Sequence, residues 1–188
     1  MSAAAQAARR AQGGALQGEG ASAKVSAFLC RAMRAEDVPA CAAVEAAVPD
    51  GWNAAALAEE LAQPAARLFV AEAAGAQTPN GASPRPIAAL AVFQLVCEEA
   101  SLYTISTAPA LRRQGAARAL LQYAFAQLAA EGAQTVFLEM RAQNGAARAL
   151  YASLGFVQTG MRRGFYTNPR DDAVLLQKSL SGMLFAKA

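Results

Sequence analysis

A chain of 188 residues suits one domain and is long enough to bury an adequate core. Its formal net charge of +3 fits an anionic ligand or an acidic partner, but it is too small to argue for nucleic-acid binding. The sequence contains no histidine, which excludes histidine-dependent triads and histidine metal sites. Cys30, Cys41 and Cys97 show no metal-ligand spacing and are interpreted as buried, reduced thiols. The longest apolar run, residues 87–97, is too short to span a bilayer.

Residues 1–24 are rich in alanine, glycine and glutamine, and Leu16 is their only large aliphatic side chain besides Met1. Such a segment cannot bury enough apolar surface to offset its ordering entropy, so we expect a disordered or frayed-helical extension. A secretory signal would need a longer apolar stretch, whereas an arginine-rich targeting peptide stays open as an alternative. We therefore expect a cytoplasmic protein with one domain over residues 25–182 and a tail over residues 183–188.

The first part of the domain alternates between strand and helix patterns. Residues 26–33 have strand-like content, and acidic residues then favour the start of a helix over about residues 36–47. Asn53 is predicted to cap a second short helix, which Pro64 ends.

Three strands are expected next. A strand over residues 67–71 is followed by glycine- and proline-rich residues 72–86, which predict a long exposed hairpin loop. The apolar run 87–97 and residues 100–107 then indicate two strands, joined tightly at residues 98–99.

Residues 110–151 indicate a loop, a helix, a strand and a second helix. The first helix is marked by apolar residues at helical spacing: Leu120, Leu121, Ala124, Phe125 and Leu128. A strand over residues 135–141 and a helix after Asn144 follow.

Two final strands are expected over residues 156–161 and 173–180, with residues 162–172 as their connection. The predicted order is strand, two helices, three strands, helix, strand, helix and two strands. This order indicates an α/β fold in which helices pack against one mixed sheet, in a single domain.

A basic loop with small residues precedes the helix that begins near Ala117. Gly115 and Ala117 let a ligand approach the backbone, and the first N–H groups of a helix are unpaired, with the positive end of the helix dipole behind them. Arg112, Arg113 and Arg118 add positive charge, so the loop suits a pyrophosphate. A solvated basic helix start is an equally good interpretation of this pattern alone.

The sequence around this loop resembles the N-acetyltransferase superfamily known as GNAT. The resemblance is carried by the strand over residues 102–107 with Pro109 after it, by the Arg112-x-x-Gly-x-Ala loop, and by the strand that contains Glu139. Residues 138–144 (LEMRAQN) and 149–156 (ALYASLGF) are similar to the bacterial RimI type, which acetylates the N-terminal alanine of ribosomal protein eighteen of the small subunit.

The resemblance implies a central, mostly antiparallel sheet in which one parallel strand pair, here around Ile105 and Glu139, splays apart to hold acetyl-CoA. Exposed backbone groups in such a splay can bind the pantetheine arm like an added strand. Asn144 is expected to hydrogen-bond the cofactor, and a plain helix cap is a compatible alternative. The expected cofactor-binding residues are Ile105, Ser106 and Thr107 for the arm, and Arg112, Arg113, Gln114, Gly115, Ala116, Ala117 and Arg118 for the pyrophosphate.

The resemblance also implies direct attack of an amine on the thioester, with Glu139 as general base and Tyr151 as general acid. Burial in an apolar strand beside a cleft would raise the pKa of Glu139 from about 4.3. The alternatives are that Glu139 faces water at a strand end, and that Tyr151 only packs in the core. Glu98 and Glu99 are weaker candidates for the base, because turn carboxylates are usually solvated.

Trp52 and Tyr166 are expected to line the acceptor groove, although Asp50 and Gly51 separate Trp52 from the proline that often adjoins it in the family. The expected acceptor is the N-terminal peptide of a ribosomal protein, with no metal, no membrane and no direct nucleic-acid contact. The oligomeric state stays open, and a monomer is favoured. Two other hypotheses stay open: acetylation of a small-molecule amine or an antibiotic, and a noncatalytic acyl-CoA-binding module.

Overall fold

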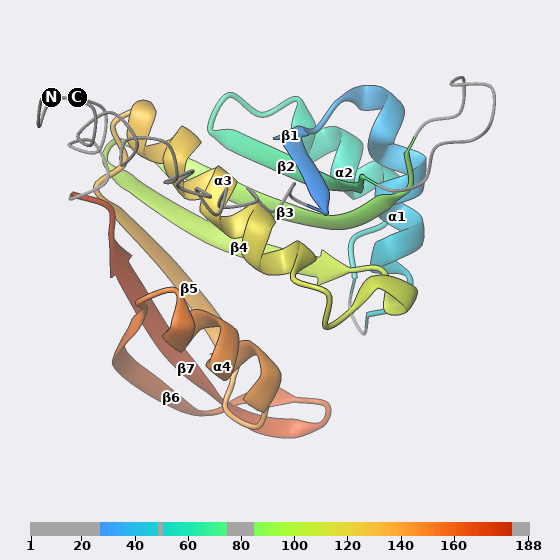
Figure 1. Ribbon diagram of the computed structural model, residues 1–188. Coiled ribbons are helices and arrows are strands. Elements are labelled where there is room, and N and C mark those ends of the chain that lie inside the picture. The colour runs from blue at the N-terminus through green and yellow to red at the C-terminus, as the bar shows by residue number, and fades with distance from the viewer. Residues whose placement is uncertain (1–26, 49–50, 75–84, 182–188) are drawn as a thin grey trace, which may run out of the picture.

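The computed structural model describes residues 27–48, 51–74 and 85–181. These residues form a seven-stranded sheet in the order β1-β2-β3-β4-β5-β7-β6 (Figure 1). Only the β4–β5 pair of this sheet is parallel. The strands are β1 (Phe28–Ala32), β2 (Ala66–Ala73), β3 (Ile87–Val96), β4 (Glu99–Thr107), β5 (Thr135–Arg141), β6 (Val157–Thr167) and β7 (Arg170–Ser179).

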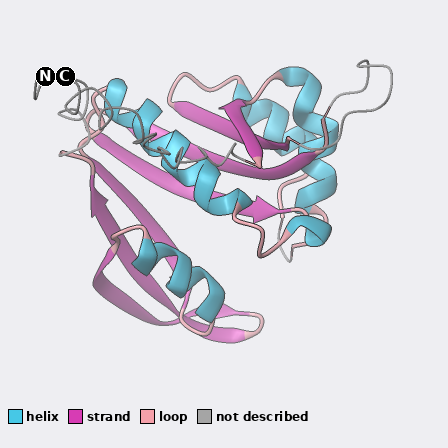
Figure 2. Cartoon of the chain, viewed as in Figure 1, coloured by secondary structure: helices cyan, strands magenta, loops and turns pink. Residues whose placement is uncertain are grey.

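The helices and strands follow one another in the order that the sequence predicts (Figure 2). They are α1 (Val38–Glu45), α2 (Ala54–Leu61), α3 (Ala116–Ala130) and α4 (Gly145–Ser153), with short 3-10 turns η1 (Ala35–Asp37) and η2 (Pro109–Leu111). The mixed α/β fold with one parallel strand pair is thereby confirmed.

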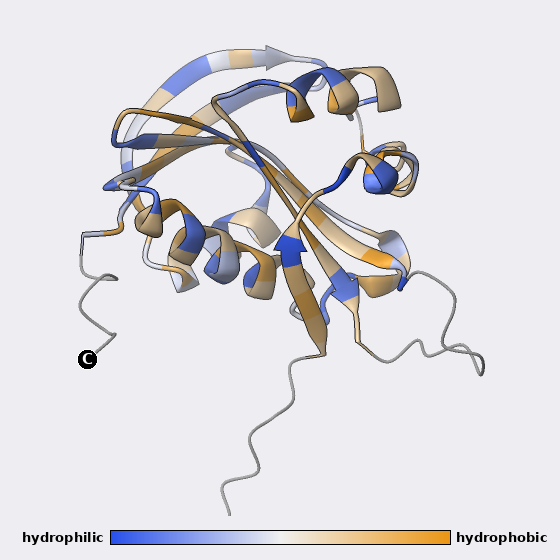
Figure 3. Ribbon diagram, turned by 90° about the horizontal axis from the view of Figure 1, so that it is seen from above, coloured by the Kyte–Doolittle hydropathy of each residue, from blue (hydrophilic) through white to orange (hydrophobic). Residues whose placement is uncertain are grey.

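The sheet separates two apolar layers, because successive side chains of a strand point to opposite faces. Phe69 and Phe93 belong to the larger core, which α3 covers, and Val70 and Val92 belong to the smaller core beneath α1 and α2. Figure 3 shows the central strands coloured largely as hydrophobic between these helices. Helices thus pack against both faces of the sheet.

Capping explains where the first helices begin. The Asn53 side chain accepts a 2.9 Å hydrogen bond from the Ala56 N–H, so the predicted cap of α2 is confirmed. The first helix is shorter than predicted, because residues 35–37 form a 3-10 turn and α1 ends at Glu45. Asp37 accepts a 2.6 Å ion-paired hydrogen bond from Arg31 of β1, which ties this turn to the sheet edge.

The expectation that residues 162–172 form a loop-like connection is wrong. β6 extends to Thr167 and β7 begins at Arg170, so these residues form a long hairpin. Their polar composition gave no alternating pattern because β6 is an edge strand whose side chains are mostly exposed. A register shift between Arg162 and Tyr166 is held by a 2.7 Å hydrogen bond from the Gly164 N–H to Asp172.

The cysteines differ from one another more than expected. All three are free, and Cys41 is buried as predicted, but Cys97 is exposed in the turn between β3 and β4. That turn lies one residue earlier than expected, since Glu99 already belongs to β4.

The predicted extension 1–24, the tail 183–188 and most of the loop 72–86 lie outside the described residues. Among the described helices, none has the length and apolar character that a membrane crossing requires.

Candidate active site

The two parallel strands pair over only part of their length. Their register runs from Glu99 opposite Thr135 to Leu102 opposite Leu138, whereas β4 continues to Thr107 and β5 to Arg141. Beyond Leu102 the strands diverge (Figure 1), and β5 stays paired with β7. The open end of β4 therefore presents backbone groups toward the gap, as the family resemblance implies.

A bulge in β4 marks the start of this divergence. Val92 of β3 pairs with Thr104 and the next residue, Phe93, pairs with Leu102, so Tyr103 is the extra residue. The Tyr103 hydroxyl donates a 2.7 Å hydrogen bond to Gln94, whose amide donates a 2.9 Å hydrogen bond to Glu60 of α2. The bulge thus turns Tyr103 toward the face of the sheet that α1 and α2 cover.

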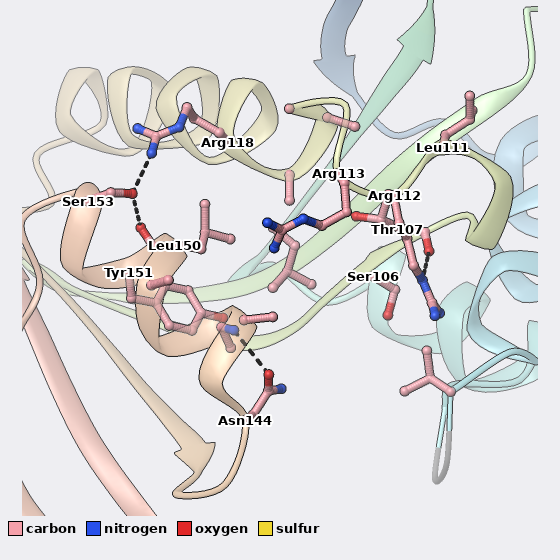
Figure 4. A pocket seen from close by; sticks show the side chains of 18 of the residues that line it. Ser106, Thr107, Leu111, Arg112, Arg113, Arg118, Asn144, Leu150, Tyr151 and Ser153 are labelled. Carbon is pink, nitrogen blue, oxygen red and sulfur yellow. Dashed lines mark hydrogen bonds between the residues drawn. The ribbon is translucent and has the colours of Figure 1, made fainter.

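A cleft of about 680 Å³ opens between the end of β4, the start of α3 and one side of α4 (Figure 4). Ten of the eleven predicted cofactor-binding residues line it: Ile105, Ser106, Thr107, Arg112, Arg113, Gly115, Ala116, Ala117, Arg118 and Asn144. Gln114 does not, because its side-chain amide turns back and donates a hydrogen bond to the Ala110 carbonyl at 3.1 Å.

The basic loop is shaped by two residues with positive φ. Arg113 has φ +64° and Gly115, which immediately precedes α3, has φ +92°. Among the described residues no side chain caps this helix start, so the leading N–H groups of α3 face the cleft without a side-chain acceptor. The side chain of Arg112 donates a 3.3 Å hydrogen bond to the Thr107 carbonyl, which fixes the loop to the end of β4.

The arginines of the loop have different orientations in Figure 4. Arg113 extends into the space between α3 and α4. Arg118 instead donates a short hydrogen bond to the Ser153 hydroxyl, which in turn donates to the Leu150 carbonyl of α4. Arg118 therefore links the two helices across the cleft and would have to leave Ser153 to reach a pyrophosphate.

The α4 side of the cleft contains Asn144 and Tyr151. The Asn144 side chain accepts a 3.0 Å hydrogen bond from the Ala147 N–H, so it caps α4 as the alternative interpretation held. Tyr151 is buried against Phe156, with ring centroids 5.4 Å apart, yet it also lines the cleft. Burial raises the pKa of Tyr151 above its ordinary value of about 10, and the neighbouring Tyr166 adds to this rise. The phenol consequently stays protonated.

A second cleft of about 420 Å³ contains the predicted base. It is lined by Ser101, Leu102, Tyr103, Phe137, Leu138, Glu139, Thr159, Tyr166, Leu175 and Leu176. Along β4 the two clefts are consecutive, because Tyr103 borders the second and Thr104 borders the first. The predicted acid and base thus line neighbouring clefts that share one strand.

The expected burial of Glu139 is wrong. Its side chain is 34% exposed and forms a 2.8 Å ion pair with Arg162 of β6. The buried residues of β5 alternate along the strand (Val136, Leu138 and Met140), and Glu139 points to the opposite face, so the apolar strand does not enclose its one carboxylate.

Tyr166 is close enough to both predicted catalytic residues to interact with them electrostatically. It interacts with Tyr151 and with Glu139, and it lines the second cleft. The Arg141 guanidinium lies 4.1 Å from the Tyr166 ring centroid. Partial burial raises the pKa of Tyr166, an effect that Arg141 opposes.

Three other predicted positions lie away from the two clefts. Trp52 packs against the smaller core and lines neither cleft. Glu98 and Glu99 lie at the end where β4 and β5 are still paired, which disfavours them as the base. Neither Tyr103 nor the Arg162 partner of Glu139 was predicted from the sequence. An isolated strand pattern gives no signal for a bulge, and the ion pair joins residues 139 and 162 of different strands.

The profile of the acetyltransferase (GNAT) family matches residues 29–156, which include β4, the basic loop, Glu139 and Tyr151. The chain belongs to this family.

Among individual proteins, the chain is similar to the ribosomal protein bS18 alanine N-acetyltransferase of Escherichia coli, with 43% identity over 97 residues. That match covers 50% of this chain and 66% of the relative, just under two thirds of its length. The N-alpha-acetyltransferase RimI of Mycobacterium tuberculosis is 32% identical over 150 residues, which cover 78% of this chain and 89% of that protein.

Solved structures extend the similarity to the fold. The crystal structure of the ribosomal-protein-S18-alanine N-acetyltransferase from Escherichia coli superposes with a TM-score of 0.69 and 32% identity, covering 81% of this chain and 94% of that chain. A spermidine/spermine N-acetyltransferase from Vibrio cholerae gives a TM-score of 0.69 at 21% identity over 85% of this chain and 97% of that chain, and so shows the fold alone.

Proposed function

We propose that this chain transfers the acetyl group of acetyl-CoA to the N-terminal alanine amine of a ribosomal protein, the counterpart of bS18. The Escherichia coli relative, a ribosomal protein bS18 alanine N-acetyltransferase at 43% identity, supports this acceptor. The Mycobacterium tuberculosis relative, an N-alpha-acetyltransferase at 32% identity, supports transfer to an α-amine. The observation that carries it is the pair of consecutive clefts along β4, one lined by Tyr151 and the other by Glu139.

The first cleft presents charged and backbone groups that suit acetyl-CoA. The open edge of β4 offers backbone donors and acceptors to an amide-containing arm, from Ile105 to Thr107. The uncapped N–H groups of α3, together with Arg112 and Arg113, suit the negative pyrophosphate. When bound, acetyl-CoA supplies the thioester carbonyl that the acceptor amine attacks.

Two residues of this chain would move protons. In the second cleft Glu139 accepts the proton of the incoming amine, directly or through a water molecule. An α-amine has a pKa of about 7.7–8.0, against about 10.4 for lysine, so a sizeable fraction of it is already neutral near pH 7. A single exposed carboxylate is therefore an adequate base for it. Tyr151, kept protonated by burial, donates its proton to the departing thiolate, and a backbone N–H near Ile105 stabilises the oxyanion.

The decisive experiment is mass spectrometry of purified ribosomal proteins after incubation with the chain and acetyl-CoA. We expect one added acetyl group on the N-terminal alanine of the bS18 counterpart. Parallel reactions contain polyamines and aminoglycosides, and turnover confined to those amines would replace the proposal with a small-molecule acetyltransferase. Absence of any turnover despite coenzyme A binding would favour a noncatalytic module.

Substitution of the proposed base separates chemistry from binding. Glu139→Gln should lower kcat/KM by about a hundredfold to ten-thousandfold, the usual contribution of a general base. Its affinity for coenzyme A should be unchanged, because Glu139 does not line the first cleft. Glu99→Gln is the matched control, since it removes a carboxylate at the paired end of the same two strands.

A further inference from the structure

The side chain that contacts the Glu139 carboxylate comes from the hairpin, not from the acceptor. Arg162 Nη1 lies 2.8 Å from Glu139 Oε1, and both side chains are partly exposed, 55% for Arg162 and 34% for Glu139. The Arg162 guanidinium therefore forms an ion pair with the carboxylate on which the proposed reaction depends.

The other charged and titratable groups around Glu139 are already engaged. Arg141 donates hydrogen bonds of 2.9 and 3.0 Å to the carbonyls of Pro169 and Asn168 while its guanidinium covers Tyr166. Asp171 accepts hydrogen bonds from the backbone N–H groups of Gln143 and Asp172. In the described part of the chain, Arg162 is the cation that forms an ion pair with Glu139.

Arg162 can leave this position without losing every contact. Its guanidinium lies 5.5 Å from the ring centroid of Phe165, an exposed neighbour on β6. Exposed ion pairs contribute little to stability, so exchange of one cation for another at Glu139 is inexpensive. An incoming α-ammonium group carries the same charge and is smaller, so it can replace the guanidinium.

We infer that Arg162 pairs with the Glu139 carboxylate before an acceptor binds and is displaced by the ammonium group of the acceptor. The inference rests on the proposed use of Glu139 as the base. Arg162 thus competes with the acceptor, and the affinity for a cationic amine is lower than the cleft would otherwise give. An acceptor without a charged amine does not meet this competition.

Calorimetry with a short peptide that begins with alanine tests the competition without turnover. The peptide is titrated into the full chain saturated with coenzyme A at pH 6.5, where its amine is protonated. Arg162→Gln should tighten binding by up to about fivefold, the range of an exposed ion pair. Arg162→Lys, which keeps the charge, should bind like the unmodified chain.

Two controls make the result specific to this contact. Arg163→Gln removes the same charge from the adjacent residue, for which no ion pair is found within the described residues, and should leave binding unchanged. In a Glu139→Gln background, Arg162→Gln should have no effect, because the carboxylate for which both cations compete is gone. The same peptide with a formylated amine should not distinguish Arg162→Gln from the unmodified chain.

The kinetic readout separates this inference from the proposed function. Arg162→Gln should lower KM for the peptide and leave kcat within about twofold, whereas Glu139→Gln should lower kcat. If Glu139→Gln abolishes turnover but Arg162→Gln and Arg163→Gln bind the peptide equally, the inference is wrong and the proposed function stands. Weaker peptide binding by Arg162→Gln also overturns it, because Arg162 would then contact the acceptor directly. A chain that binds the peptide as described but transfers no acetyl group refutes the proposed function alone.

Discussion

The Oε2 atom of Glu45, at the end of α1, accepts a 2.9 Å hydrogen bond from the backbone N–H of Trp52. Glu45 is 1% exposed, and its other oxygen lies 3.5 Å from the Thr104 hydroxyl of β4. Gly51 fits only as glycine, since a Cβ there would lie 2.2 Å from the Glu45 carbonyl oxygen. This buried carboxylate therefore joins the segment before α2 to the strand that borders both clefts.

Removal of the Glu45 carboxylate should destabilise the fold more than its replacement by an uncharged amide. Glu45→Ala leaves a buried N–H group without its acceptor and should lower the free energy of unfolding by about 1–3 kcal/mol. Glu45→Gln keeps an acceptor oxygen and should cost less. Urea denaturation measures both, with Glu36→Ala as the exposed acidic control. Equal stability of all three variants would show that the hydrogen bond to Trp52 has no net effect.

The left-handed glycine before α3 should matter for both stability and ligand binding. Gly115 has φ +92°, so Gly115→Ala should lower stability by about 1 kcal/mol through backbone strain. Gly132, at φ +98° beyond the other end of α3, has the same open surroundings and provides the matched substitution. Both variants should be destabilised alike in urea, but only Gly115→Ala should weaken coenzyme A binding in calorimetry. Equal coenzyme A affinities would remove the loop from the ligand site.

Local signals predicted the elements that depend on local chemistry. The caps at Asn53 and Asn144 could be predicted because capping involves neighbours within a few residues. Gly115 was predicted as a small residue at the start of α3, but its positive φ was not. The family resemblance then placed the parallel strand pair and its divergence, which no local pattern contains.

Interactions between distant residues were not predictable in this way. Arg118 bonds to Ser153 and Glu139 to Arg162, and each contact depends on how separate elements pack. Exposure of Glu139 was only the alternative to the expected burial for the same reason, because neighbours in the sequence do not reveal which face of the sheet other elements cover. The extension of β6 through Thr167 was missed because an edge strand with exposed side chains lacks the apolar alternation that marks a half-buried strand.

The buried thiol of Cys41 should make the fold sensitive to alkaline pH. Burial raises the pKa of Cys41 from its ordinary value of 9.0 to about 12. The unfolded chain thus loses this proton first, so the stability from the neutral thiol is complete below pH 9 and is lost as the pH rises toward about 12. One group contributes a slope of at most about 1.4 kcal/mol per pH unit.

Denaturation at several pH values between 8 and about 11 tests this linkage. Cys41→Ala should be less stable than the unmodified chain at pH 8 by about 1 kcal/mol, because it leaves a small void. The difference should shrink as the pH rises, since the variant has no thiol to ionise. Cys97→Ala, at an exposed position, is the control and should follow the unmodified chain at every pH. A constant difference for Cys41→Ala would contradict the raised pKa.

Tyr151→Phe should separate the proposed acid from the packing role that its burial also suggests. The ring lies against Phe156 and stays nearly as large in the variant, so the free energy of unfolding at pH 7 should change by less than about 1 kcal/mol. If the hydroxyl protonates the departing thiolate, kcat should fall by about a hundredfold or more while the affinity for coenzyme A changes little. Tyr123→Phe, on α3 against Phe69, removes a hydroxyl from a residue that lines neither cleft and should retain full activity.

Steady-state kinetics with a substrate whose leaving thiol has a low pKa adds a second readout, because such a thiolate needs no proton in order to leave. The Tyr151→Phe defect should diminish with that substrate, and a defect of unchanged size would assign Tyr151 to packing alone.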